Sequence, residues 1–275
     1  MSNALRNFMT STDQHTKTAL ITGASGGIGL ELAKLFAADG YSLVLVARSK
    51  DKLEEVSRDL KSHFGISVKN IVKDLSVVEN CREVHEEISR EGIRIDVLVN
   101  NAGAGTWGDF WKTELEAEMQ NMRLNMLSLV YLTKLFLKDM IQNRHGKILN
   151  VASTAAFQPG PLMAVYYASK AFVLSFSEAL SNETRGTGVT ITALCPGPTD
   201  TNFRAAAGMQ KSMLFSKHLN LPAAQVARAG YEGMKRGKVI VVPGFKNRLV
   251  IQLLRVSPRG FIRKAVRKMQ EARRN

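Results

Sequence analysis

Cysteine is scarce in this sequence. Only Cys81 and Cys195 occur, far apart and without the short Cys or His spacing of a metal site, and the five histidines are scattered. This pattern argues against a scaffold built on disulfides or structural zinc and favours a reducing compartment. We therefore expect no metal site and a cytoplasmic protein.

Long apolar runs are also missing. A membrane-spanning helix needs about 18 to 20 apolar residues, and the nearest candidate, residues 239–254, is interrupted by Pro243, Lys246 and Arg248. Residues 1–17 are polar, with no apolar core and no small-residue cleavage pattern, so they do not resemble a secretory signal. We expect a soluble protein that begins with a flexible N-terminal extension over residues 1–17.

Acidic residues are nearly absent from the C-terminal part. The chain has 38 Lys and Arg against 24 Asp and Glu, a net charge of +14. Residues 235–275 hold thirteen of these bases and one acid, Glu271, which leaves 25 bases and 23 acids elsewhere. The basicity therefore belongs to the C-terminal part. Because this part lacks interleaved aromatics and any recognised nucleic-acid-binding motif, we expect no nucleic acid partner.

Seven short β-branched runs alternate with longer segments of helical periodicity. Their near-continuous apolar character, as in "LVLVA" and "DVLVN", is typical of strands covered on both faces. The alternation predicts an α/β, Rossmann-type doubly wound fold, with a parallel seven-stranded sheet and helices on both faces. The predicted strands are residues 18–22, 41–47, 67–72, 95–100, 147–151, 189–194 and 239–242.

A glycine-rich turn, "TGASGGIG" at residues 22–29, joins the first predicted strand to the first helix. Gly23, Gly27 and Gly29 permit a tight turn and let the backbone approach a pyrophosphate at the N-terminus of that helix. The spacing differs from the general dinucleotide-binding fingerprint. By itself, the motif also allows a turn that binds no ligand.

The stretch "YYASK" at residues 166–170 contains a candidate catalytic pair. Residues four apart on a helix share a face, so Tyr166 and Lys170 project together while Tyr167 points elsewhere. A phenol with a pKa near 10 is a poor base at neutral pH, and a nearby ammonium favours the phenolate. We predict Tyr166 as general acid/base, tuned by Lys170. The alternative is a packed ring beside a solvated amine.

Five motifs together resemble the short-chain dehydrogenase/reductase family in order and spacing. They are the glycine turn, "NNAG" at residues 100–103, Ser153 thirteen residues before Tyr166, the Tyr-x-x-x-Lys pair, and "PG" at residues 196–197. The resemblance runs from about residue 17 to residue 242. It implies a single doubly wound domain, a nicotinamide cofactor, and carbonyl reduction or alcohol oxidation without a metal.

The resemblance also implies roles for individual residues. Ser153 would donate its hydroxyl to the substrate oxygen, Lys170 would also hydrogen-bond the nicotinamide ribose, and Asn125 would position a proton-relay water. A turn serine and an exposed helical asparagine are the ordinary alternatives. The implied cofactor contacts are Gly23, Ser25, Gly26, Gly27, Ile28 and Gly29 at the turn, Asp74 and Leu75 at the adenine, Asn101, Ala102 and Gly103 at the ribose, Tyr166 and Lys170, and Pro196, Gly197, Thr199 and Thr201.

The end of the second predicted strand, "VLVARSKDK", indicates which nicotinamide cofactor is preferred. In NAD-binding folds an acidic residue here holds the ribose 2′-hydroxyl, whereas an Arg accommodates a 2′-phosphate. Ala47 stands where the acid would be, Arg48 follows it, and Ser49 and Lys52 are close by. We predict NADP(H). The alternative is that Arg48 is a solvated neighbour of the next helix.

Residues from about 199 to 220 resemble the family's mobile substrate lid. Their apolar members suggest a pocket for a hydrophobic or acyl-type carbonyl, although a core-facing helix would explain them as well. They are Phe203, Met209, Met213, Leu214 and Phe215.

Residues 244–275 are predicted as a basic helical extension after a catalytic domain at residues 18–243. One helical face has Phe261, Ile262, Ala265, Val266 and Met269, and the other has Arg263, Lys264, Arg267 and Lys268. Such a helix can make weak peripheral contact with an anionic membrane, or it can cover its own domain or a partner subunit.

We therefore predict an NADPH-dependent oxidoreductase that acts on a small-molecule carbonyl or alcohol and assembles as a homodimer or homotetramer. Two rivals remain at this point. One is a catalytically silent NADP(H)-binding regulator, and the other is a nucleic-acid-binding protein that uses the basic tail.

Overall fold

The computed structural model describes residues 16–209 and 220–271. Most of the predicted N-terminal extension (residues 1–15), lid residues 210–219 with Met213, Leu214 and Phe215, and residues 272–275 lie outside the described part.

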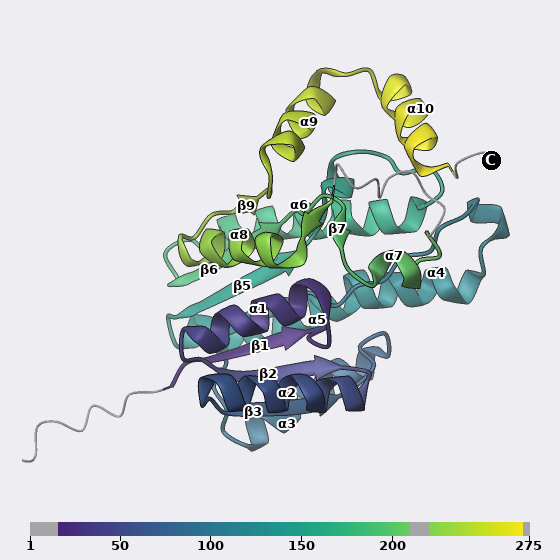
Figure 1. Cartoon of the computed structure of the whole chain (residues 1–275). Helices are drawn as coiled ribbons and strands as arrows, with labels where there is room; N and C mark the ends of the chain where they lie inside the picture. Colours follow the sequence, from purple (N-terminus) through teal and green to yellow (C-terminus); the bar gives the residue numbers. More distant parts are fainter. Residues whose placement is uncertain (1–15, 210–219, 272–275) are drawn as a thin grey trace, which may run out of the picture.

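A seven-stranded parallel sheet forms the centre of the protein (Figure 1). Its strand order is β3-β2-β1-β4-β5-β6-β9, so the chain starts in the middle, runs out to one edge, and crosses back to build the other half. This is the doubly wound fold predicted from the sequence, and its switch point lies between β1 and β4. The strands are β1 (Thr18–Thr22), β2 (Ser42–Ala47), β3 (Val68–Val72), β4 (Val97–Asn100), β5 (Gly146–Val151), β6 (Val189–Leu194) and β9 (Ile240–Val241).

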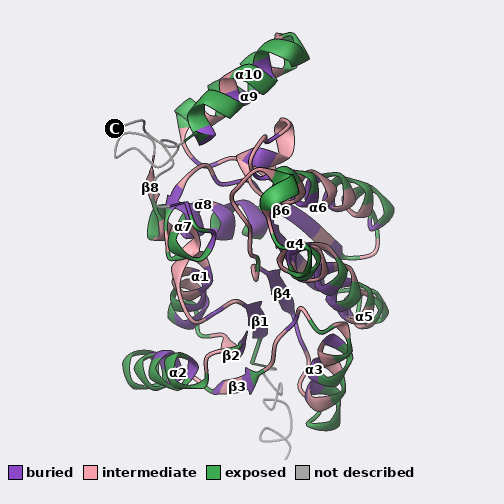
Figure 2. Cartoon of the chain, turned by 90° about the vertical axis from the view of Figure 1, so that its right-hand side faces the viewer, coloured by how far each residue is buried: buried purple, intermediate pink, exposed green. Residues whose placement is uncertain are grey.

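Helices cover both faces of the sheet, as predicted, and Figure 2 shows the strands buried between them. α1 (Gly27–Ala38), α2 (Lys50–Phe64) and α8 (Ala223–Lys235) pack on one face through residues such as Phe36 and Tyr231. The other face carries α3 (Val78–Arg90), α5 (Ser128–Gln142) and α6 (Ala164–Glu183). Shorter elements are η2 (Phe110–Lys112), α4 (Leu115–Met122), the π-helical turn η3 (Arg123–Leu127), η4 (Thr154–Phe157) and α7 (Phe203–Ala206).

The predicted bounds of β1 and β6 are confirmed, and those of the other five strands differ from the observed ones by one or two residues at one or both ends. Tyr41, for example, lies outside β2, because its backbone N–H donates to the carbonyl oxygen of Phe36 in α1 at 3.1 Å and not to a neighbouring strand. The sequence did not predict a small two-stranded sheet formed by β7 (Thr199–Asp200) and β8 (Leu221–Pro222). Strands of two residues are too short to show an alternating pattern.

Two helices, α9 (Phe245–Val256) and α10 (Arg259–Gln270), form the C-terminal arch seen in yellow in Figure 1. Ile262 and Val266 of α10 are buried against the protein's own domain, which was one of the open alternatives for this helix. The predicted five-residue apolar face is therefore divided, because Phe261 and Met269 remain 66% and 40% exposed. In the described ranges, no helix has the length and apolar content needed to cross a membrane.

Candidate active site

A cavity of about 520 Å³ opens where the strands end and extends from the glycine turn to α10. All but two of the predicted site residues line it; Gly29 and Asn125 do not. Those on its wall are Gly23, Ser25, Gly26, Gly27, Ile28, Arg48, Ser49, Lys52, Asp74, Leu75, Asn101, Ala102, Gly103, Ser153, Tyr166, Lys170, Pro196, Gly197, Thr199 and Thr201.

The glycine turn forms an open cradle at the start of α1. Gly27 has a φ of 56°, and a Cβ on Gly29 would lie 2.4 Å from the carbonyl oxygen of Gly23, so both positions require glycine. Gly26 is the N-cap, where an added Cβ would meet no atom within 4 Å, and the first turn has no acidic residue. Free backbone N–H groups at this helix end favour an anion, so these residues fit a pyrophosphate group.

Asn101 has a structural role that its sequence motif did not reveal. Its Nδ2 donates to the carbonyl oxygens of Thr22 and Gly23 at 2.9 and 3.2 Å, and its backbone N–H donates to Thr22 Oγ1 at 3.0 Å. These bonds join the end of β4 to the glycine turn after β1. Asn101 therefore fixes the shape of the cradle at the switch point of the sheet.

Ser153, Tyr166 and Lys170 come together on the wall of the cavity. Ser153 precedes η4, while Tyr166 and Lys170 share one face of α6, as their spacing predicted. The Ser153 side chain hydrogen-bonds the Tyr166 phenol, and Lys170 Nζ lies 5.8 Å from the centroid of the Tyr166 ring. Lys170 Nζ also donates to the carbonyl oxygen of Val151 at 2.8 Å, which holds the ammonium group in place.

Burial acts on the pKa values of both α6 residues. It raises the pKa of Tyr166 above its ordinary value, and the hydrogen bond to Ser153 opposes that rise. It lowers the pKa of Lys170 to about 8, because a charged amine is poorly solvated there. At neutral pH, Tyr166 therefore carries its proton and can donate it, with a mostly charged amine beside it.

Asn125 lies behind the cavity wall. Its Oδ1 accepts from the backbone N–H of Ala104 at 2.9 Å, and its Nδ2 donates to the Ala104 carbonyl and to Ser169 Oγ at 2.8 and 3.0 Å. The side chain is 2% exposed, so the alternative of an exposed helical asparagine is wrong. These bonds brace the segment after β4 against η3 and α6, and the positioning of a water by Asn125 stays a prediction.

The Tyr167 ring packs edge-on against that of Tyr166 with centroids 6.1 Å apart, and both residues line the cavity, but their hydroxyls have different partners. The Tyr167 ring also packs on Gly160, where an added Cβ would come within 2.0 Å of a ring atom. Its hydroxyl accepts a hydrogen bond from Gln270 Nε2 of α10 at 2.8 Å. The two neighbouring hydroxyls therefore have different partners: that of Tyr166 lies with Ser153 in the cavity, and that of Tyr167 is bonded to the C-terminal arch.

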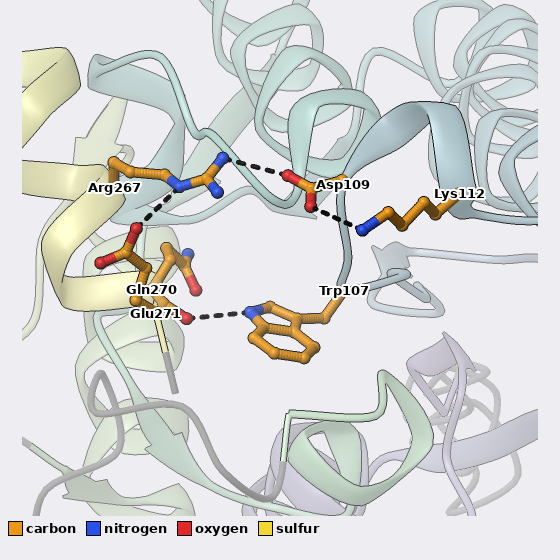
Figure 3. A network of polar contacts seen from close by, with 6 residues as sticks. All are labelled: Trp107, Asp109, Lys112, Arg267, Gln270 and Glu271. Atoms are coloured by element: carbon orange, nitrogen blue, oxygen red, sulfur yellow. Dashed lines mark hydrogen bonds and ion pairs between the residues drawn. The ribbon is translucent and has the colours of Figure 1, made fainter. Parts of the chain in front are cut away.

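Two further bonds fasten α10 to the domain (Figure 3). Trp107 Nε1 donates to the backbone carbonyl of Gln270 at 3.0 Å, and Arg267 forms an ion pair with Asp109 at 3.1 Å. Gln270 lines the cavity and is fully buried. Sequence reasoning could not find this residue, because a lone Gln in a basic helix has no distinguishing pattern.

The part of the cavity near α10 is apolar. Met163, Phe203 and Met209 line it with Tyr166, whose ring lies 5.1 Å from that of Phe203. Phe203 and Met209 were predicted pocket residues, whereas Met163 was missed. Within the described ranges, no group of His, Cys, Asp or Glu side chains could hold a metal ion.

The chain belongs to the short chain dehydrogenase family, whose model matches residues 17–212. Very-long-chain 3-oxoacyl-CoA reductase-B of Danio rerio is 34% identical over 184 residues, which are 66% of this chain and 58% of that protein. 17-beta-hydroxysteroid dehydrogenase type 3 of Mus musculus is 38% identical over 182 residues, 65% of this chain and 58% of that protein. The match thus spans less than two thirds of these relatives' own length.

A solved structure of similar fold is a short-chain dehydrogenase from Sphingobium yanoikuyae in complex with NADPH. It is 30% identical and has a TM-score of 0.79, with 94% of this chain and 100% of that chain covered. The family match and this likeness agree on the doubly wound fold of the short-chain type.

Proposed function

We propose that this protein is an NADP(H)-dependent oxidoreductase that reduces a ketone or aldehyde, or oxidises the corresponding secondary alcohol, with Tyr166 as general acid/base. The observation that carries the proposal is the meeting of Ser153, Tyr166 and Lys170 in a cavity that also contains the glycine cradle. The intact set of three groups argues against the rival of a catalytically silent NADP(H)-binding regulator.

The three side chains divide the proton chemistry among them. The substrate oxygen would lie against the Ser153 and Tyr166 hydroxyls, and Ser153 would stabilise the negative charge that develops there. Tyr166 would donate its proton to that oxygen, and the Lys170 ammonium would stabilise the phenolate left behind. The nicotinamide cofactor, when bound, supplies the hydride for the carbonyl carbon.

The preference for NADP(H) rests on the end of β2. Ala47 offers no carboxylate that would repel a 2′-phosphate, and Arg48 and Lys52 line the cavity beside it. Arg48 NH1 is 3.8 Å from Asp74 Oδ2, and the Arg48 side chain is 71% exposed, so this guanidinium is free to turn toward a phosphate. The NADPH bound to the Sphingobium relative supports the same choice.

A hydrophobic or acyl-type carbonyl is the proposed substrate. The apolar end of the cavity supports it, and so do the names of the relatives, which act on 3-oxoacyl-CoA and on hydroxysteroids. The homodimeric or homotetrameric state and the cytoplasmic location stay predictions.

A pair of phenol variants tests the proposal. Tyr166→Phe should lower turnover by roughly a hundredfold or more, the usual contribution of general acid catalysis, and leave NADPH binding intact. Tyr167→Phe should remain active, because its hydroxyl bonds to Gln270. The assay is NADPH oxidation across a panel of ketones that includes 3-oxoacyl esters and steroid ketones. Equal turnover by the two variants on a ketone that the natural protein reduces would refute the assignment of Tyr166.

A further inference from the structure

Helix α9 presents an apolar stripe to solvent. Phe245, Leu249, Leu253 and Val256 are 73%, 50%, 54% and 82% exposed, and their spacing places them on one side of the helix. Ile251, on the opposite side, is buried. α9 therefore has two apolar faces, and within the described residues the domain covers only one of them.

The charge around this stripe has one sign. Residues 245–270 contain eight Lys and Arg and no Asp or Glu. Lys246 lies on one flank of the stripe, and Arg248 and Arg255 lie on the other, by their positions on the helix. All three side chains are exposed, and Figure 2 shows most of α9 and α10 in the colour of exposed residues.

The basic residues of the arch have few partners within the protein. Among the Lys and Arg residues of α9 and α10, only Arg267 forms ion pairs with described residues, namely Asp109 and Glu271. Lys246, Arg248 and Arg255, which flank the stripe, form no ion pair with another described residue. An apolar stripe flanked by bases fits a surface that is anionic outside and apolar just beneath.

We propose that α9 docks on an anionic lipid bilayer, with the stripe of Phe245, Leu249, Leu253 and Val256 at the boundary between headgroups and acyl chains. A second copy of the chain is a poorer occupant. A two-fold interface places the same patch of both copies together, and here that would oppose like-charged flanks. The contact is carried by α9, whereas the sequence had pointed to the apolar face of α10, which the domain partly covers.

A vesicle experiment on the full chain tests the charge requirement. Phosphatidylcholine vesicles with and without phosphatidylserine are sedimented with the protein at low and at physiological salt. Binding is expected only with phosphatidylserine and should weaken in salt, which screens charges beyond about 8 to 10 Å. Lys246→Glu with Arg255→Glu should lower partitioning by roughly 30-fold or more, since each base contributes about a factor of five. Lys134→Glu with Lys138→Glu on α5, the same charge change elsewhere, should have little effect.

A second pair of variants tests the stripe. Leu249→Ser with Leu253→Ser should abolish most vesicle binding, whereas Tyr131→Ser with Ile141→Ser, which removes exposed apolar groups from α5, should not. Thermal melting shows whether each variant is folded, and sedimentation velocity gives its oligomeric state. The proposal is overturned if the natural chain does not bind anionic vesicles, or if the α9 and α5 variants bind alike. It is also overturned if the stripe variants only convert a dimer to a monomer.

This test does not depend on catalysis. Vesicle binding is measured by sedimentation, so a protein without reductase activity can still bind lipid, and an active enzyme can fail to bind it.

Discussion

Replacement of Gln270 by Leu measures how firmly α10 is attached to the cavity wall. Gln270 is fully buried, and its Nε2 donates to the buried Tyr167 hydroxyl at 2.8 Å. Leaving that hydroxyl without a partner costs about 1 to 3 kcal/mol. Leu also removes the Gln270 Oε1 atom, which is buried and has no hydrogen-bond partner among the described residues, and this offsets part of the loss. We therefore expect the free energy of unfolding to fall by about 1 to 2 kcal/mol.

The effect should stay local. The Trp107 bond uses the backbone carbonyl of residue 270, and the ion pair with Asp109 uses Arg267, so both survive the substitution. For a domain of this size, 1 kcal/mol corresponds to about 2 to 4 °C in the melting temperature. The expected decrease is thus about 2 to 8 °C, measured by calorimetry and by urea unfolding.

A double-mutant cycle isolates the bond itself. Gln270→Leu and Tyr167→Phe should show a coupling of about 1 kcal/mol, because each removes one partner of the same hydrogen bond. Tyr231→Phe is the matched control, since its hydroxyl donates to Asp39 at 2.6 Å on another side of the domain. Gln270→Leu and Tyr231→Phe should be additive within about 0.5 kcal/mol. A coupling no larger than this control would refute the attachment of α10 through Tyr167.

Two further predictions concern the cofactor and the lysine. Arg48→Ala should raise the KM for NADPH by roughly ten- to a hundredfold and the KM for NADH much less. Lys50→Ala, which replaces an equally exposed base outside the cavity, should change neither KM. Equal effects on the two cofactors would show that Arg48 does not bind the 2′-phosphate. Burial lowers the pKa of Lys170 to about 8 from 10.5, so between these values Lys170 holds more protons in the unfolded chain. The stability of the natural protein relative to Lys170→Met should therefore rise with pH, by on the order of 3 kcal/mol. Lys170→Met should lack this rise in urea unfolding, and parallel curves for the two proteins would contradict the assignment.

The sequence by itself determined the parts of this protein that depend on local spacing. Short, near-continuous apolar runs predicted the strands, a period of 3.6 predicted the helices, and the alternation of the two predicted the doubly wound sheet. The i, i+4 rule selected Tyr166 over Tyr167 as the partner of Lys170, because helix geometry fixes which side chains share a face. The glycine turn was equally local, since close approach of Gly29 to Gly23 arises within seven residues.

Only the tertiary structure decided what covers each face and which polar groups meet across long distances. Trp107 and Gln270 are separated by 163 positions, and the Asn125 side chain is directed to Ala104 and Ser169 by the packing of η3 on α6. Periodicity predicted an amphipathic helix at α10, but it could not tell that the domain buries Ile262 and Val266 or that α9 leaves its outer stripe exposed. Amphipathicity is a property of one helix, whereas burial depends on the partner that packs against it.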